Sequence, residues 1–379
     1  MKILHTSDWH LGSAHRTHSF EADQRHFIDE ICGVIERERV DAVLLCGDVY
    51  DRSAPAAEAV KLYNETVERI CAAMGVKLLI VAGNHDSPSR LSTYRALVRA
   101  AGLFVAGELA PGIEPVSIGN ADIYMLPWFT TDRARAAFAE EADKIDSMED
   151  AYRVALDAIR ASFRPDRRHI LMAHAFVVSA ELSESDRSAV VGTAAAIGRS
   201  VLEGFDYVAL GHIHKPQQIG ERIRYSGAPM AYSFGSEEDQ VKSVTLLDTE
   251  TMEARTLPLH PLHERRTISG TLSELRAGTG LTEAQRNGYV RLRVSDMVVD
   301  AALAEELRGV YPNLLEWSGR SFEAGTGGVS VALEELDALS NDPVELFRRF
   351  CEDRHAAADE HMLALFREAV TACEGSMDA

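Results

Sequence analysis

Five short groups of side chains that can bind metal ions are spread along the first 214 residues of the chain. The groups are Asp8-Trp9-His10, Gly47-Asp48, Gly83-Asn84-His85-Asp86, His174 and Gly211-His212-Ile213-His214. Together they offer carboxylate and amide oxygens and imidazole nitrogens, a mixture that suits manganese, iron or zinc. The set is large enough to hold two ions at one centre.

Each group follows a short apolar run, and helical patterns separate the runs. Such runs predict strands that are buried on both faces of a sheet, here at residues 2–6, 41–46, 76–82, 169–173 and 207–210. Ligands bind at the carboxyl ends of strands in open α/β sheets. The sequence therefore predicts that all five groups lie on the side of the fold where chemistry is expected.

The spacing within the groups supports a shared centre. Residues two apart on an extended chain point to the same side, so Asp8 and His10 can address one ion together, as can His212 and His214. Asp48 has two carboxylate oxygens and can bridge two ions.

Residues beside these ligands suit the same centre. Asn84 offers a neutral carbonyl oxygen, which adds no negative charge to the site. The glycines at positions 47, 83 and 211 allow tight turns and close backbone approach. Four histidines near the first group break its spacing, and we expect them to be surface or supporting groups: His5, His15, His18 and His26.

The five groups resemble those of the calcineurin-like metallophosphoesterase superfamily. The surroundings of two groups, Trp9-His10-Leu11-Gly12 and His85-Asp86-Ser87-Pro88, are more closely similar to DNA nuclease subunits within it. The resemblance runs through most of the chain. It is weaker at Ala173, because many relatives have a glycine before the histidine of the fourth group.

This resemblance implies two metal ions, with manganese favoured, and a role for each side chain. One ion is expected on Asp8, His10, Asp48 and His214, and the other on Asp48, Asn84, His174 and His212. Two such ions clamp a phosphodiester and lower the pKa of a bound water. His85 is expected to contact the scissile phosphate and to protonate the leaving group, and Asp86 is expected to orient His85.

The resemblance also implies a function and partners. We expect a nuclease with double-strand exonuclease and single-strand or hairpin endonuclease activity, acting in DNA repair with a coiled-coil ATPase. A homodimer within a heterotetramer is expected, formed through helices near 56–74 and 90–101. Two alternatives are a phosphoesterase for small phosphodiesters or phosphoproteins, and a DNA-tethering scaffold without important catalysis. The complete ligand set argues against the scaffold.

The expected fold class is α/β, with four segments. A two-sheet metallophosphoesterase sandwich flanked by helices covers residues 1–262, and a small α+β capping domain covers 263–324. A glycine-containing linker at 325–340 precedes C-terminal helices at 341–379, which are expected to bind the ATPase. Five arginines could contact phosphate, although a solvated strand face explains each equally well: Arg265, Arg266, Arg291, Arg293 and Arg320.

Composition sets outer limits on these expectations. The net charge of −20 opposes strong DNA binding by this chain alone, because phosphate contacts normally come from Lys and Arg. Five scattered cysteines without a Cys-x-x-Cys pair indicate reduced thiols, as in a cytosol. The chain shows no signal-peptide pattern and no apolar run near the roughly 20 residues that span a bilayer. We therefore expect a cytoplasmic protein without membrane contact.

Overall fold

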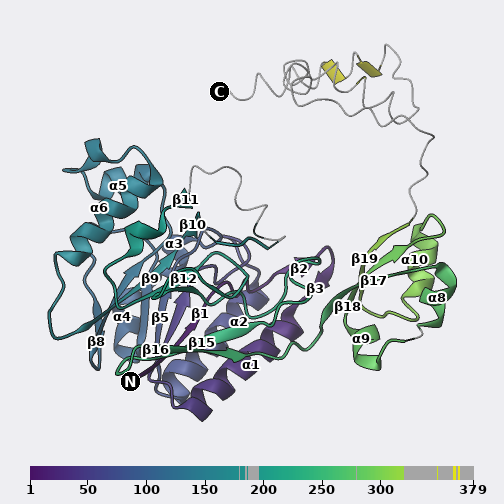
Figure 1. The fold of residues 1–379 in the computed structure, drawn as a ribbon, viewed down its shortest axis with the longest axis horizontal. Helices are drawn as coiled ribbons and strands as arrows, with labels where there is room; N and C mark the ends of the chain where they lie inside the picture. The colour runs from purple at the N-terminus through teal and green to yellow at the C-terminus, as the bar shows by residue number, and fades with distance from the viewer. Residues whose placement is uncertain are drawn as a thin grey trace. The chain divides into compact units, whose positions relative to one another are not determined.

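The computed structural model describes residues 1–178, 180–183, 186, 196–278 and 280–319, together with 348, 362, 363, 366 and 367. The chain divides into two units, Met1–Arg320 and Ser321–Ala379 (Figure 1). All elements named below belong to the first unit. The expected linker at 325–340, nearly all of the expected helices at 341–379, and Arg320 lie outside the described residues.

Two six-stranded sheets form the centre of the first unit. The first sheet contains β16 (Glu253–Pro258), β15 (Ser243–Asp248), β1 (Lys2–Thr6), β4 (Ala42–Cys46), β5 (Lys77–Val81) and β6 (Leu103–Ala106), in that spatial order. The second contains β13 (Gln217–Gln218), β14 (Ile223–Tyr225), β12 (Tyr207–Gly211), β9 (Arg168–His174), β8 (Ala121–Leu126) and β7 (Val116–Ile118). The strands β1, β4, β5 and β6 run parallel, as do β14, β12, β9 and β8.

The two sheets pack face to face through an apolar layer. Ile3, Leu44 and Leu79 of the first sheet share this layer with Ile170 and Met172 of the second. Successive side chains of a strand point to opposite faces, so the alternate residues of the same strands cover the outer faces. Every residue of β4 is buried for this reason, which explains why the strand is an unbroken apolar run.

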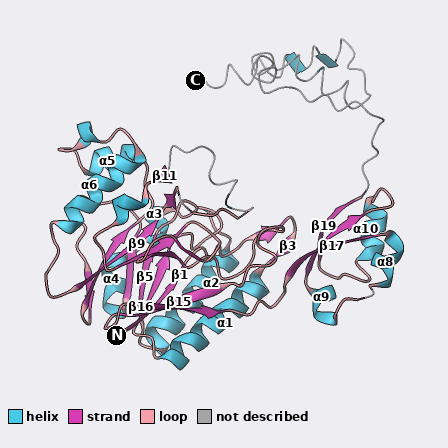
Figure 2. Cartoon of the chain, viewed as in Figure 1, coloured by secondary structure: helices cyan, strands magenta, loops and turns pink. Residues whose placement is uncertain are grey.

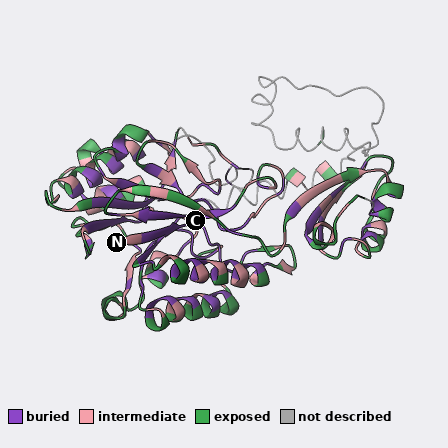
Figure 3. Cartoon of the chain, turned by 60° about the horizontal axis from the view of Figure 1, so that its bottom comes forward, coloured by how far each residue is buried: buried purple, intermediate pink, exposed green. Residues whose placement is uncertain are grey.

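Helices cover both outer faces of this sandwich (Figure 2). The apolar sides of α1 (Glu21–Glu38) and α2 (Ala57–Val67) pack on the first sheet, and that of α6 (Met148–Arg160) packs on the second. In Figure 3 the central strands of the sandwich are buried along their length, whereas the edge strand β16 is largely exposed and the helices are buried on one side only. The predicted two-sheet α/β fold is confirmed.

One predicted helix is broken into pieces. The region expected to be helical at 90–101 consists of α3 (Pro88–Leu91), α4 (Arg95–Val98) and a 3-10 turn at Arg99–Ala101. The break falls at Tyr94, whose φ of 56° is left-handed and cannot continue a right-handed helix. The expectation of one continuous helix here was wrong.

The region after residue 262 has its own small apolar core. Its three parallel strands are β17 (Arg265–Gly270), β18 (Tyr289–Val294) and β19 (Leu314–Ser318). The helices α8 (Leu272–Ala277) and α10 (Ala301–Leu307) cover them, as the order of patterns in the sequence predicts. A short helix that was not predicted, α9 (Glu283–Asn287), precedes β18. We call residues 263–319 the cap.

The remaining short elements lie in loops or at the ends of the two sheets. They are β2 (Ala14–His15), β3 (His18–Ser19), α5 (Thr131–Ala137), β10 (Phe176–Val177), β11 (Ala196–Ile197) and the 3-10 turns Ala142–Lys144 and Arg199–Leu202. A π-helix at Glu68–Ala73 continues α2 directly. Among the described residues, no helix combines the length and the apolar character needed to cross a bilayer.

Close backbone contact between the two sheets explains why a motif residue is glycine. A Cβ placed on Gly211, at the end of β12, would lie 1.7 Å from the carbonyl oxygen of Cys46, at the end of β4. A Cβ on Gly83 would lie 2.1 Å from Oδ1 of Asp48. The strand ends therefore approach each other as closely as their backbones permit.

Gly211→Ala should force the sheets apart at this point, with a matched substitution as control. Overpacking of this kind costs about 1–3 kcal/mol, so the melting temperature should fall by several degrees. Gly33→Ala is the control, because a Cβ there meets nothing within 4 Å and alanine favours the interior of α1 by about 0.5–1 kcal/mol. Calorimetry checks both variants. Equal melting temperatures for Gly211→Ala and the unaltered chain would contradict the close approach.

Candidate metal centre

The predicted ligands occupy unusual backbone conformations. Asp8, His10, Asp48 and His212 have φ angles of 54°, 42°, 47° and 103°. Non-glycine residues rarely adopt such values, which cost of the order of 1–3 kcal/mol each and persist only where the surroundings enforce them. Backbone hydrogen bonds enforce them here, since Asp8 N donates to Gly47 O at 3.1 Å and His10 N donates to Asp48 O at 3.0 Å. The turns aim the side chains at a common centre.

One set of side chains gathers around His10. Ligand atoms of Asp8, His10 and His214 lie within 4.8 Å of one another. The Nε2 atoms of His10 and His214 are 3.1 Å apart, and Oδ2 of Asp48 is 3.8 Å from Nε2 of His10. Neighbouring ligands on an ion with bonds of about 2.1 Å stand about 3 Å apart. Two ring nitrogens that face each other at this distance fit a shared cation.

A second set gathers around Asn84. Its Oδ1 lies 2.9 Å from Nε2 of His174 and 3.1 Å from Nδ1 of His212. Nε2 of His174 is also 3.4 Å from Oδ2 of Asp48. Asp48 thus faces both sets, as expected for a bridging carboxylate. The structure brings together all seven side chains predicted to bind metal.

Hydrogen bonds outside the centre fix these ligands. His174 Nδ1 donates to the carbonyl oxygen of Cys46 at 2.9 Å, so Nε2 is the nitrogen that faces the other ligands. The backbone N–H of His212 donates to Asp8 Oδ1 at 3.0 Å, and that of His85 donates to Asp48 Oδ1 at 2.9 Å. Each of these bonds joins the end of one strand, or the loop after it, to the end or loop of another strand. The loops are therefore held together even before a ligand binds.

The electrostatics of the centre favour bound cations. Burial raises the pKa of Asp8. Burial opposes ionisation of Asp48 too, but the imidazole of His174 holds the pKa of Asp48 well below its usual range. Burial lowers the pKa of His10, and it lowers the pKa of His212 to about 3, so both rings are neutral ligands at physiological pH.

The carboxylates around His174 favour a positive charge at its position. Burial would lower the pKa of His174, yet the neighbouring carboxylates of Asp48 and Asp8 raise it to about 9. A divalent cation at the centre would balance the negative charge of these carboxylates more fully. The donor types, their burial and their charge therefore fit divalent metal ions.

The two residues expected to be catalytic have different surroundings. His85 Nδ1 donates to the carbonyl oxygen of Asp51 at 2.7 Å, and its ring lies edge-on to that of His10 with centroids 4.9 Å apart. Asp86 does not orient His85, so that expectation was wrong. Its carboxylate instead accepts the backbone N–H groups of Val49, Tyr50 and Gly83. Asp86 ties together the loops after β4 and β5, where backbone donors surround it.

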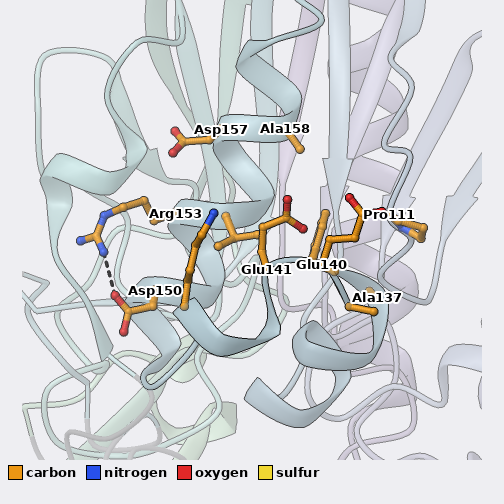
Figure 4. A pocket seen from close by; sticks show the side chains of 12 residues that line it. Pro111, Ala137, Glu140, Glu141, Asp150, Arg153, Asp157 and Ala158 are labelled. Atoms are coloured by element: carbon orange, nitrogen blue, oxygen red, sulfur yellow. Dashed lines mark hydrogen bonds and ion pairs between the residues drawn. The ribbon is translucent and has the colours of Figure 1, made fainter.

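A cavity of about 300 Å³ opens onto the centre. It is lined by His10, Ser13, Ala14, Phe20, Asp48, Asp51, His85, Asp186, His212, His214 and Tyr232. A larger cavity of about 710 Å³ lies beside α5 and α6 (Figure 4). Acidic side chains line it, and one of them, Asp150, is paired with Arg153 at 2.7 Å. None of the described residues that line that larger cavity is a histidine or a cysteine, so we assign the chemistry to the smaller one.

The four histidines that break the motif spacing support neighbouring elements. His5 is fully buried, accepts a hydrogen bond from Tyr207 at 3.0 Å and donates to Leu210 O at 3.1 Å. His15 and His18 lie in the β2–β3 hairpin, and His26 donates to a backbone carbonyl at 2.9 Å. Among the described residues, none of the four belongs to a metal-binding cluster.

Two of the five candidate phosphate-binding arginines make internal contacts instead. Arg265 is 4% exposed and lies over the ring of Phe20, with 4.7 Å to the centroid. Arg291 donates to Thr267 at 2.9 Å and pairs with Glu238 at 3.3 Å. Both side chains join the cap to the loops of the sandwich, which is a third role beside the two that the sequence left open for them.

The sequence analysis missed a group of charged and polar residues behind His214. Glu237 and Lys242 form a buried ion pair with a distance of 2.8 Å, and Tyr232 lines the cavity. The only signal in the sequence is a glutamate and a lysine five residues apart before a predicted strand. That spacing is too common to select them.

Comparison with known proteins relates the chain to one family and to named relatives. Residues 1–216 match the model of the calcineurin-like phosphoesterases, and residues 259–355 match a model described as the type 5 capsule protein repressor C-terminal domain. A protein of Staphylococcus epidermidis, named as a subunit of the nuclease SbcCD, is 27% identical over 359 residues, covering 94% of each chain. A protein of the same name from Staphylococcus saprophyticus is 28% identical over 342 residues, covering 89% of this chain and 90% of the relative.

Comparison with solved structures adds less. TT1561 of Thermus thermophilus covers 68% of this chain and 99% of its own, at 16% identity and a TM-score of 0.37. GAP50 of Plasmodium, described as the anchor in the inner membrane complex, covers 86% of this chain and 99% of its own, at 10% identity and a TM-score of 0.40. TM-scores this low support no conclusion about the chain.

Asp48→Asn should remove most of the bound metal, because Asp48 faces both sets of ligands. Elemental analysis of the folded variant after gel filtration in manganese checks this. Asp41→Asn is the control, since the side chain of Asp41 accepts a hydrogen bond from the backbone N–H of Lys2 and is no part of either ligand set. The bridging position would be refuted if Asp48→Asn kept both metal equivalents.

Proposed function

The chain belongs to the calcineurin-like phosphoesterase family, and from this premise we propose that it is a metal-dependent DNA nuclease. The observation that carries the proposal is the gathering of two ligand sets on Asp48, with His85 beside them in an open cavity. Relatives that match about nine-tenths of the chain are named as nuclease subunits. The reaction proposed is hydrolysis of the phosphodiester bond, as a double-strand exonuclease and as an endonuclease on single strands and hairpins.

The proposed centre holds two divalent ions, with manganese as the native metal. Such ions polarise a phosphodiester and lower the pKa of the attacking water. The chain itself holds His85 at the cavity, with Nδ1 bound to the carbonyl of Asp51. That bond leaves Nε2 to contact the phosphate and to protonate the leaving oxygen. His85 therefore acts as the general acid, a role that histidine fills most often.

The cap supports a polymeric substrate over a small phosphodiester. The guanidinium of Arg16, in the β2–β3 hairpin, lies over the ring of Trp317 in the cap, 5.7 Å from the ring centroid. In the same hairpin, Nε2 of His15 lies 3.9 Å from a carboxylate oxygen of Glu316 in the cap. The same hairpin begins at Ala14, which lines the cavity. An extra domain beside one rim of the centre suits a long substrate that continues past the scissile bond. We propose that DNA runs along this rim.

His85→Gln should keep the bound metal and lose about 10²–10⁴-fold in rate, the usual contribution of a general acid. Cleavage of circular single-stranded DNA with manganese measures the rate, and elemental analysis measures the metal. His260→Gln is the control, because its side chain is 79% exposed. Loss of one ion from His85→Gln would instead make His85 a ligand. If the unaltered chain cuts bis(p-nitrophenyl) phosphate but no DNA, the small-substrate alternative holds.

We propose a homodimer that pairs through the segment after the third motif. Tyr94 and Leu97 are 72% and 74% exposed although both are large and apolar. Such residues on one short segment are typical of a surface covered by another chain. In this proposal two copies act together within a heterotetramer that includes an SbcC-type coiled-coil ATPase.

Leu97→Asp should give a monomer that still binds metal. Multi-angle light scattering at micromolar concentration measures the mass. Val241→Asp is the matched control, since Val241 is 70% exposed on a different loop and its replacement should leave the dimer intact. A monomeric unaltered chain would exclude the dimer.

The proposed contact with the ATPase lies in residues 341–379. This proposal rests on the sequence, where Leu346, Phe347 and Phe350 share one predicted helix face. Truncation before Asn341 should leave a metal-binding protein that still nicks single-stranded DNA. The truncated chain should no longer co-purify with an SbcC-type ATPase. If it precipitates instead, these residues belong to the folded core and the docking proposal fails.

A further inference from the structure

A buried ion pair lies behind the proposed metal centre and outside all five motifs. The side chains of Glu237 and Lys242 are 0% and 3% exposed, with 2.8 Å between Oε2 and Nζ. Lys242 Nζ also donates to the carbonyl oxygen of His214 and to Gln240, both at 3.1 Å. Burying two charges costs desolvation free energy that an apolar pair would avoid. The pair therefore calls for a reason beyond stability.

The position of the pair connects the two sheets. Lys242 immediately precedes β15 of the first sheet, whereas His214 follows β12 of the second. The carbonyl oxygen of His214 accepts two hydrogen bonds, from Lys242 Nζ and from Ala228 N, both at 3.1 Å. The pair thus fixes one proposed ligand at the seam between the sheets.

The ring of His214 lies between the proposed metal position and two carboxylates. Its Nε2 faces His10, whereas its Nδ1 lies 3.9 Å from Glu237 and 3.8 Å from Asp186. The carboxylate of Asp186 already accepts hydrogen bonds from the backbone N–H of His214 and from the backbone N–H and the hydroxyl of Ser183. Glu237 also interacts with the His214 ring, while Ser233 Oγ at 2.6 Å and Tyr232 N at 3.2 Å hold its carboxylate in place.

We propose that Glu237 is a positioning residue that keeps the proton of His214 on Nδ1, so that Nε2 presents its lone pair to a metal ion. Lys242 holds the carboxylate of Glu237 in place and balances its charge. A carboxylate behind a ligating histidine fixes the ring and makes it a better electron donor. This inference rests on the proposed metal-dependent function.

The two proposed metal positions therefore differ in what supports them. His174 donates its Nδ1 hydrogen to a neutral carbonyl, that of Cys46, whereas a carboxylate with its own counterion stands behind His214. Tyr232 adds to the difference, because its ring lies 5.2 Å from that of His10 and 5.5 Å from that of His214. Loss of Glu237 should weaken the ion on Asp8, His10 and His214 and spare the other.

The test compares the Mn²⁺ affinity of a variant without the Glu237–Lys242 charges with that of a control variant at the neighbouring Glu238. The double variant Glu237→Gln/Lys242→Met removes both charges and keeps similar shapes. Calorimetric titration with Mn²⁺ should show one site weakened about 10- to 100-fold and the other unchanged. Electron paramagnetic resonance should show a single isolated Mn²⁺ where the unaltered chain shows a coupled pair. Glu238→Gln is the control, because Glu238 binds Thr267 and Arg291 instead of His214.

Melting in EDTA separates positioning from a purely structural role. Positioning predicts a melting temperature in EDTA close to that of the unaltered chain and a smaller increase on adding Mn²⁺. The proposal would be overturned if the folded double variant bound both Mn²⁺ ions as tightly as the unaltered chain does. The proposal would also be overturned if the double variant melted at a lower temperature in EDTA while Mn²⁺ raised its melting temperature by as much as it does for the unaltered chain.

A measurement on the unaltered chain covers the case in which the variant does not fold. Nitrogen-15 resonances of the histidine rings, with His214 assigned by the loss of its signals in His214→Gln, report which nitrogen carries hydrogen. The proposal predicts Nδ1–H with Mn²⁺ replaced by diamagnetic Zn²⁺, and Nε2–H would overturn it. If the protein binds two ions in this way but cuts no DNA, the proposed nuclease function fails and the role of Glu237 stands.

Discussion

The centre depends on the contact between the ends of β4 and β12, where Gly211 leaves no room for a side chain against Cys46. This contact brings the carboxyl ends of the parallel strands of two mixed sheets to one seam. The first sheet then supplies Asp8, His10, Asp48 and Asn84 from the loops after β1, β4 and β5. The second supplies three imidazoles, those of His174, His212 and His214, from the ends of β9 and β12. Oxygen ligands come mostly from one side and nitrogen ligands from the other.

Building a site across such a seam has a cost in backbone strain and buried charge. Four of the proposed ligands have left-handed φ angles, and each is unfavourable by of the order of 1–3 kcal/mol. Hydrogen bonds from one loop to another hold them, including those that Asp86 accepts from Val49, Tyr50 and Gly83. The charges at the centre repel or attract one another strongly because the side chains that carry them are buried. Bound cations would relieve this repulsion, which explains why a site so costly to form is present.

Much of the fold could be predicted because local patterns determine it. Unbroken apolar runs such as that of β4 are typical of strands covered on both faces, and all five predicted strands are confirmed. The ligand groups were identifiable because each one follows a strand and because pairs two residues apart share a side. The succession of strands and helices in the cap was predictable from hydrophobic periodicity for the same reason.

The incorrect predictions concern properties set by distant contacts. Asp86 was expected to orient His85, but its partners are backbone groups of another loop, which no local pattern reveals. The helix near 90–101 breaks at Tyr94, although its composition favours a helix. Glu237 was missed because its importance depends on His214, which is far away in the sequence. In each case the deciding partner is brought close only by the fold.

The account requires two metal ions on either side of Asp48, and anomalous diffraction tests this most directly. Crystals grown with Mn²⁺ should give two anomalous peaks about 3.5–4 Å apart. One peak should touch Asp8, His10 and His214, and the other should touch Asn84, His174 and His212, with Asp48 touching both. A single peak at saturating Mn²⁺, or two peaks that do not share Asp48, would contradict the account.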